Sequence, residues 1–187
     1  MSLFSIVARE DFISIVLDCE ESYDTKMLER TIFREIFPNQ SFFIFNGQGD
    51  LGIETWELAK TLSFQKLNFK EIALIIQQQW QLKTNLTINT EAVIGGISEN
   101  EEIQYHIITA EDEVQSFYPK PGESLYYAND LPFQQDSMEE LAKTLMMKGM
   151  SSIPQAQKAQ YKLYEKFAGV TPGTSSQAYC MVVEKQH

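Results

Sequence analysis

The sequence has few of the residues on which disulfide and metal chemistry depend. It contains two cysteines, Cys19 and Cys180, and two histidines, His106 and His187. Both cysteines lie in apolar, strand-like contexts, and no Cys-x-x-Cys pair is present. Because such thiols are typically buried and unpaired in a reducing compartment, we expect no disulfide and a cytoplasmic location. With no third histidine or nearby cysteine to complete a zinc set, we also expect no metal and no cofactor.

Basic residues and long apolar runs are scarce as well. Fifteen Lys and Arg stand against 26 Asp and Glu, which gives a formal net charge of −11. Nucleic acids and anionic membranes bind a basic surface, so we expect neither as a partner, and solubility accounts for the acidity. No apolar run approaches the ~18 residues of a membrane-spanning helix. Residues 1–4 lack the cationic and apolar regions of a signal peptide, so we expect none.

The centre of the chain predicts a β-hairpin. Glu91–Ser98 is an apolar run that contains the pair Gly95–Gly96, and Ile103–Ile108 is a second apolar run after a short polar link. Two such runs joined by a polar turn are typical of paired antiparallel strands. Glycine weakens the interior of a strand, so the glycine pair indicates that another backbone approaches closely at this point.

Short runs of β-branched and aromatic residues predict further strands on both sides of this hairpin. A chain of 187 residues can bury most of its apolar surface in one unit, so we expect a single domain over residues 1–187. The run Phe42–Phe45 has no polar break, which favours a central strand covered on both faces. The other predicted strands cover residues 4–8, 12–17, 32–37, 114–118, 124–128 and 178–183.

Two helices are predicted before the central hairpin. A glycine-rich link over residues 46–52 lacks the Gly-Lys-Ser/Thr ending of a phosphate loop, so we interpret it as a strand-to-helix turn. The first helix then runs from about Ile53 to Leu67. Asn68 and Glu71 have the spacing of a capping box and predict the start of the second helix, whose inner face includes Trp80.

Two more helices are predicted after the central strands. Ser137, with Glu140 at the capping-box position, predicts the start of the third helix. Pro154 suits the first turn of the fourth helix, and Gly169 suits its end. The fourth helix places small and apolar side chains at helical spacing on one face. These inward residues are Ala156, Ala159, Leu163 and Phe167.

The predicted order of elements is two hairpins, two helices, further strands, two helices and a last strand. This order resembles the four-layer αββα sandwich of the N-terminal-nucleophile (Ntn) hydrolases, and the residues resemble the branch of proteasome β-subunits and bacterial HslV-type peptidases. Ser2 begins the first strand and Asp18 ends the second, as the nucleophile and a supporting carboxylate do in that family. Phe42–Gly47 resembles the family's apolar strand and glycine turn, and Val93–Ile97 resembles its apolar-Gly-Gly-apolar strand.

The resemblance implies an α+β fold with two stacked antiparallel sheets between helical layers, and a catalytic set built on the N-terminus. By position, Ser2 would be the nucleophile, with its own α-amino group as the base. Asp18 would be the supporting carboxylate, and Gly47 would supply a backbone N–H to the oxyanion. Thr174 falls near the family's late serine. The core of this fold should include Ile15, Phe43, Val93 and Ile94.

The chain departs from the family's pattern at its charged positions. The family's lysine falls near Arg34, which stays protonated and cannot transfer a proton, with Lys26 as the alternative cation. The late aspartate falls near the uncharged Thr171. Met1 precedes Ser2, so the serine amine is free only after Met1 is removed. Catalytic groups that act as a unit lose most of their effect when one is removed, so these departures predict a degenerate site.

We therefore predict a proteasome-β-like protein that is catalytically degenerate and serves in binding or assembly. The alternative is an active N-terminal-serine peptidase or amidase that uses Ser2. Because subunits of the resembling family form rings, the resemblance also implies self-association into a homo-oligomer. The third helix is rich in methionine, which we expect to pack in the core, with an adaptable apolar surface as the alternative. These residues are Met138, Met146, Met147 and Met150.

His106 and an acidic cluster are the remaining polar features. We expect His106 to be a core or sheet-face residue, because its use as a base would need a serine or cysteine within hydrogen-bond reach. The acidic residues at the hairpin ends predict solvated turns. A weak calcium site is the alternative, although the Asp-x-Asp-x-Asn-Gly order is missing. These residues are Glu99, Glu101, Glu102, Glu111, Asp112 and Glu113.

Overall fold

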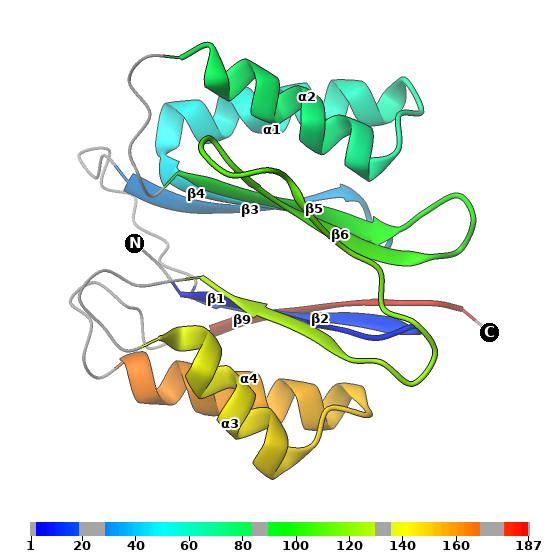
Figure 1. Ribbon diagram of the computed structural model, residues 1–187, viewed down its shortest axis with the longest axis vertical. Coiled ribbons are helices and arrows are strands. Elements are labelled where there is room, and N and C mark those ends of the chain that lie inside the picture. Colours follow the sequence, from blue (N-terminus) through cyan, green and yellow to red (C-terminus); the bar gives the residue numbers. More distant parts are fainter. Residues whose placement is uncertain (1–2, 19–28, 84–89, 130–135, 169–177, 187) are drawn as a thin grey trace. The chain divides into compact units, whose positions relative to one another are not determined.

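The computed structural model describes residues 3–18, 29–83, 90–129, 136–168 and 178–186. The chain divides into two compact units: unit 1 consists of Met1–Tyr23 and Pro119–His187, and unit 2 consists of Asp24–Tyr118. The described residues form an α+β fold in which each unit has one antiparallel sheet and two helices (Figure 1). The predicted α+β class and the predicted order of strands and helices are therefore confirmed.

Unit 1 is built on a four-stranded antiparallel sheet in the order β8-β1-β2-β9. The last strand pairs with β2 over the whole of its length, from Phe12 opposite Glu184 to Asp18 opposite Ala178. Both helices cover the same face of the sheet (Figure 1). The elements are β1 (Phe4–Ala8), β2 (Phe12–Asp18), β8 (Leu125–Ala128), α3 (Ser137–Lys148), α4 (Ile153–Ala168) and β9 (Ala178–Glu184).

The core of unit 1 lies between its sheet and its helices and includes a small polar group. The predicted inward residues of α4 are all buried in this core against Val7 and Phe12 of the sheet. Gln160 is buried among them, accepts a hydrogen bond from Ser14 Oγ at 2.6 Å and donates to the Ser5 carbonyl at 3.0 Å. A buried polar side chain is tolerated when it is hydrogen-bonded in this way, and the bonds fix α4 on β1 and β2.

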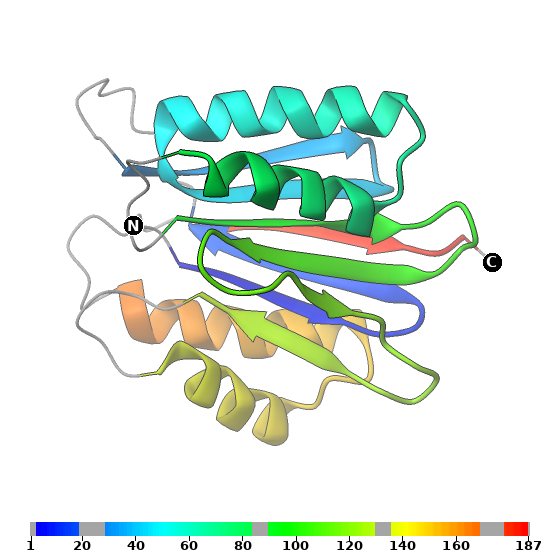
Figure 2. The same cartoon turned by 45° about the horizontal axis from the view of Figure 1, so that its top comes forward.

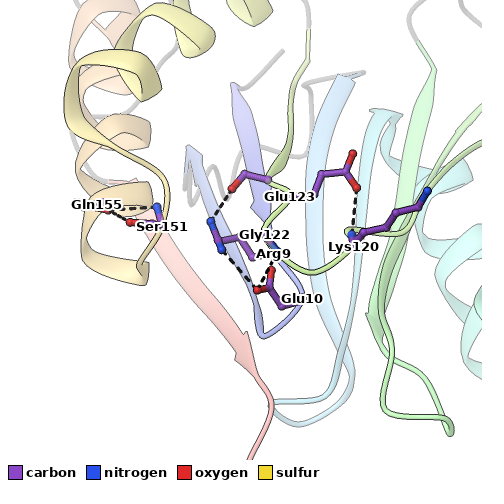
Figure 3. A network of polar contacts seen from close by, with 8 residues as sticks. Arg9, Glu10, Lys120, Gly122, Glu123, Ser151 and Gln155 are labelled. Carbon is purple, nitrogen blue, oxygen red and sulfur yellow. Dashed lines mark hydrogen bonds and ion pairs between the residues drawn. The ribbon is translucent and has the colours of Figure 1, made fainter.

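The β1–β2 turn is tied to the loop that leads into β8 (Figure 3). Glu10 Oε1 accepts a hydrogen bond from the Gly122 amide at 3.2 Å, and Arg9 Nη1 donates to Ser124 Oγ at 3.1 Å. Arg9 also forms an ion pair with Glu10 at 3.5 Å. The backbone amides of Glu10 and Gly122 lower the pKa of the Glu10 carboxyl, so the carboxylate stays charged and holds the loop.

Unit 2 is built on a five-stranded antiparallel sheet in the order β3-β4-β5-β6-β7. As predicted, Phe42–Phe45 lies in a central strand, β4, and is fully buried. The predicted core residues Phe43, Val93 and Ile94 in this unit, and Ile15 in unit 1, are buried too. The elements are β3 (Glu29–Phe37), β4 (Ser41–Gln48), α1 (Gly49–Phe64), α2 (Phe69–Gln81), β5 (Glu91–Ile97), β6 (Ile103–Thr109) and β7 (Gln115–Phe117).

Helices α1 and α2 cover one face of the sheet in unit 2 (Figure 2). The capping box at the start of α2 is confirmed, because Asn68 Oδ1 accepts from the Glu71 amide at 2.9 Å and Glu71 Oε2 accepts from the Asn68 amide at 3.0 Å. Trp80 of α2 is buried and donates from Nε1 to Thr55 Oγ1 of α1 at 3.1 Å. Its ring meets Phe45 edge-on with centroids 6.0 Å apart.

The glycine pair in β5 lies where neighbouring backbones approach, as predicted. A Cβ on Gly95 would lie 2.6 Å from the Gln104 carbonyl oxygen of β6. A Cβ on Gly96 would lie 2.1 Å from the Gln40 carbonyl oxygen, and Gly96 has φ +148°, which side-chain-bearing residues rarely adopt. Both positions therefore require glycine. At Gly95 the reason is close packing, and at Gly96 it is close packing together with the backbone conformation.

Two helix starts differ from the sequence prediction. Helix α1 begins at Gly49, about one turn before the predicted Ile53, and so includes Gly52. Helix α3 is capped by Asp136, which accepts from the Glu139 amide at 3.0 Å, and not by Ser137. The Ser137 hydroxyl donates instead to the Asn129 carbonyl at 2.5 Å, so it anchors the start of α3 to the segment after β8.

The expectation that the four methionines in and just after α3 pack in the core is wrong for two of them. Met146 and Met147 are 81% and 70% exposed, whereas Met138 and Met150 lie half-buried against the core of unit 1. The alternative, an apolar surface on α3, fits these two exposed side chains.

Candidate functional site

Several residues assigned by the family resemblance lie outside the described part of the chain. These are Ser2, Lys26, Thr171 and Thr174. Asp18 is the last residue of β2, as predicted, and its backbone pairs with Ala178 of β9. Its place at the strand end is the one that the resemblance assigns to the supporting carboxylate.

Arg34 and Gly47 both belong to unit 2. Arg34 lies in the middle of β3, and its exposed side chain donates from Nη1 to the carbonyl of Phe33 at 2.8 Å. It forms no ion pair with any residue that the structure describes.

Gly47 lies in β4 with φ +148°, and a Cβ there would come within 3.1 Å of the Phe45 ring and 3.3 Å of Thr90 Oγ1. The position therefore favours glycine, and it lies inside β4 opposite Arg30 of β3.

A pocket of about 680 Å³ lies within unit 2, at one end of its sheet. Three connecting segments line it: the β3–β4 turn, the link between α1 and α2, and the β5–β6 turn. Gln104 of β6 and Tyr118 after β7 also line it. We call it the turn pocket. Its volume is within the ~300–1,000 Å³ range that is usual for small-molecule sites.

A chain of hydrogen bonds runs beside the turn pocket along the edge of the sheet. His106 is fully buried, with Nδ1 2.9 Å from Ser116 Oγ and Nε2 2.9 Å from Gln104 Oε1. The register of the strands explains this grouping, because His106 lies opposite Ser116 and two residues after Gln104 on the same face of β6. The prediction that His106 is a core residue is confirmed, and the structure adds a serine within hydrogen-bond reach.

The electrostatics of this chain of bonds favour a neutral imidazole. Burial, together with the nearby charge of Lys70, lowers the pKa of His106 to about 4. An amide oxygen can only accept, so Nε2–H of His106 donates to Gln104, and Nδ1 accepts from the Ser116 hydroxyl. A general base is most effective with a pKa near the operating pH. His106 is therefore suited to hold Gln104 and Ser116 in place, and it is a poor base for activating Ser116.

Gln104 connects the buried histidine to the turn pocket. It is 6% exposed, its Oε1 is bound to His106, and its amide nitrogen makes no hydrogen bond within the described part of the chain. Within the described ranges, three residues other than glycine have a positive φ, and all three lie in the turns around the pocket. They are Asn39, Lys66 and Glu101. Such conformations cost energy and are frequent at functional sites.

The sequence alone could have located only part of the group formed by Gln104, His106 and Ser116. The alternation of β6 could have placed Gln104 beside His106 on one face. Ser116 could not have been assigned, because its place depends on the register between β6 and β7 across an irregular turn.

Neither the protein-family models nor the curated proteins gave a match to this chain. None of the helices in the described ranges is long and apolar enough to cross a membrane. In the same ranges, no three or more His, Cys, Asp or Glu side chains are grouped so that they could hold a metal ion.

Proposed function

We propose that this chain is a proteasome-β-like protein of the Ntn-hydrolase fold, with a binding or assembly role. The observation that carries the proposal is the connectivity. Two antiparallel sheets with a helix pair each arise in the order expected of that fold, with β1 and β2 first and β9 returning to pair with β2. The proposal includes the stacking of the two sheets between helical layers, as a four-layer αββα sandwich.

The proposed loss of catalysis is supported by the residue at the family's lysine position. Arg34 is exposed and bound to the carbonyl of its neighbour Phe33, so its charge lies in water, where electrostatic effects are weak. A preorganised charge acts strongly only in a site from which water is excluded. His106 does not offer a substitute base, because its pKa is lowered to about 4.

An active N-terminal-serine peptidase or amidase is the second candidate, and Gly47 favours it. Its φ of +148° and its close neighbours favour glycine at a position in β4 where the resemblance places the backbone N–H that binds the oxyanion. Asp18 at the end of β2 is the matching carboxylate position.

The deciding experiment is mass spectrometry of the protein isolated from its own cell, followed by assays with fluorogenic peptides and a serine-directed probe. We expect no adduct on Ser2 and no turnover above that of Ser2→Ala. The second candidate replaces this proposal if three results are found together. Met1 is removed in the cell, the probe forms an adduct on Ser2, and Ser2→Ala abolishes turnover. A crystal structure in which the two sheets do not face one another would reject the fold on which both rest.

We also propose that the chain self-associates into a homo-oligomer. The support within unit 1 is the exposed pair Met146–Met147 at the end of α3. Methionine side chains adapt to partner surfaces because they are unbranched and polarisable. The pair is a candidate contact between copies of the chain.

A further inference from the structure

Strand β9 forms one edge of the sheet in unit 1, because β2 is the only described strand that pairs with it. The Lys185 amide donates to the Asp11 carbonyl at 2.9 Å, which continues the same ladder by one residue. Hydrogen-bonded pairs alternate along an antiparallel ladder, so every second residue of β9 directs its N–H and C=O away from β2. No backbone hydrogen bond within the described ranges uses these outward groups. They belong to Ala178, Cys180, Val182 and Glu184.

The other sheet edges in the described ranges each carry a feature that hinders pairing with a further strand. β7 has three residues and β8 has four, so neither supports a long ladder. β3 has nine residues, but its register shifts between Glu35 and Phe37, and it carries the charged side chain of Arg34. Short strands, bulges and charged side chains are the means by which proteins keep sheet edges from pairing with other chains.

Strand β9 has none of these protective features. It has seven residues, its register with β2 is unbroken, and it contains no proline. Its one charged residue is the last, Glu184, so the stretch from Ala178 to Val183 is uncharged in a chain whose net charge is −11. An uncharged edge of this length is a template for an added strand.

The outer edge of β9 is complementary to a second copy of itself. Two identical strands related by a twofold axis run antiparallel and present the same edge to each other. An axis at Met181 places Cys180 of one copy opposite Val182 of the other, and it pairs all the outward residues of both copies. The two Glu184 side chains then lie at opposite ends of the pair, about 20 Å apart, where their repulsion is screened.

Helix α4 adds side chains to this contact. Gln157 Nε2 donates to Cys180 Sγ at 3.0 Å, and Tyr161 hydrogen-bonds to the same thiol, so this face of α4 lies beside β9. Tyr161 is 37% exposed and lines a hollow of about 530 Å³ together with Lys158 and Glu165. The twofold axis reverses the direction of α4 in the second copy, so Lys158 of one copy comes toward Glu165 of the other. The charges of the two faces are therefore complementary.

We propose that two copies of this chain pair through the outer edges of β9, so that their unit 1 sheets join into one continuous antiparallel sheet flanked by the two α4 helices. The inference rests on the proposed self-association and deepens it, because it names a contact and its symmetry. This contact is separate from Met146–Met147, since α3 packs on β8 at the opposite edge of the sheet.

A cross-link tests the register. Residues that face each other in a non-hydrogen-bonded antiparallel pair have Cα atoms about 4.5 Å apart, which a disulfide can span. In a full chain with Cys19→Ser and Cys180→Ser, Met181→Cys should therefore give a covalent dimer on mild oxidation. Val183→Cys is the matched control, because its two copies would lie on the order of 13 Å apart. No covalent dimer from Met181→Cys on a non-reducing gel, or equal yields from both variants, would overturn the proposal.

Val182→Pro tests the backbone pairing itself. The Val182 N–H points outward, so proline removes no hydrogen bond to β2, and proline is tolerated on edge strands. Self-association measured by light scattering should weaken by roughly tenfold or more. Val182→Thr keeps the N–H and the branched shape and should associate as the wild type does. Circular dichroism checks that both variants are folded.

The outcomes separate this inference from the proposal on which it rests. A folded Val182→Pro variant that associates as the wild type does would overturn the β9 contact and leave self-association standing. A wild-type protein that is monomeric at micromolar concentration would overturn both.

Discussion

At the scale of single residues, His106 shows how burial decides the role of a titratable group. Its two ring nitrogens are satisfied by Ser116 and Gln104, so the neutral ring fits the core without an unpaired polar atom. A protonated ring would carry two N–H donors and a charge into a site that is closed to solvent. Burial and the charge of Lys70 lower the pKa of His106, so the folded state loses stability relative to the unfolded state as the pH falls below the usual histidine pKa.

This predicts that the free energy of unfolding falls as the pH is lowered from 6.5 to about 4. The pKa of His106 is lowered from 6.5 to about 4 in the folded chain, so between these values the unfolded state binds the proton and the folded state does not. The contribution is complete above pH 6.5 and is lost as the pH falls toward 4. A shift of this size corresponds to on the order of 3 kcal/mol. Urea denaturation at a series of pH values measures it.

His106→Phe should flatten this pH dependence, although it lowers stability at neutral pH through the lost hydrogen bonds. His187→Ala is the matched control and should keep the full slope. The same slope in wild type and His106→Phe would mean that other groups cause the acid destabilisation.

At the residue scale, the sequence predicted less of the candidate site than of the core. The apolar and glycine positions of β4 and β5 follow from local patterns, and burial of Phe43, Val93 and Gly95 could be predicted. The grouping of Gln104, His106 and Ser116 depends on strand register and could not. Polar side chains acquire their partners through tertiary pairing, which a local pattern does not encode.

At the scale of elements, helix α1 shows where local propensity is overruled. Gly52 disfavours a helix by about 1 kcal/mol relative to alanine, so the sequence placed it in a loop. In the structure a Cβ at this position would lie 2.5 Å from Phe45 and 2.6 Å from Ile32. The glycine lets α1 lie close on β3 and β4, and the packing gained by the whole helix exceeds the local cost.

The glycine pair of β5 provides a prediction at this scale. Gly96→Ala forces a side chain into a φ of +148° and against the Gln40 carbonyl, so the strand and the β3–β4 turn must move apart. Strain and overpacking together should lower the free energy of unfolding by roughly 3 kcal/mol. Chemical denaturation of the variant and the wild type measures the difference.

Gly122→Ala is the control for conformation alone. Gly122 has φ +80°, but a Cβ there meets nothing within 4 Å. Its replacement should cost only about 1 kcal/mol. If both variants lose the same free energy of unfolding, close approach at Gly96 adds nothing to the cost of the backbone conformation.

At the scale of the whole molecule, the proposed self-association depends on an exposed apolar pair. Met146 and Met147 are 81% and 70% exposed at the end of α3, where the sequence led us to expect core packing. The helical period explains the difference, because Leu141, Thr144 and Leu145 already fill the buried face of this helix.

The prediction is that light scattering finds an oligomer at micromolar concentration and that Met146→Gln with Met147→Gln shifts it toward monomer. Loss of two apolar contacts per subunit should weaken association by roughly tenfold or more. Leu82→Gln, at a residue of unit 2 that is 78% exposed, is the matched control and should leave the mass unchanged. A monomeric wild-type protein would refute the proposal of self-association.

The pairing of β2 with β9 has a consequence for how the protein is made. Unit 2 is continuous in sequence, so all its strands and helices leave the ribosome before α3, α4 and β9 do. During that time β1 and β2 lack both β8 and β9, and each exposes an unpaired edge. At ~5–20 residues per second, β2 waits on the order of ten seconds for its partner. Translation speed and chaperone access over this interval should therefore govern the yield of native protein more than the stability of the finished fold does.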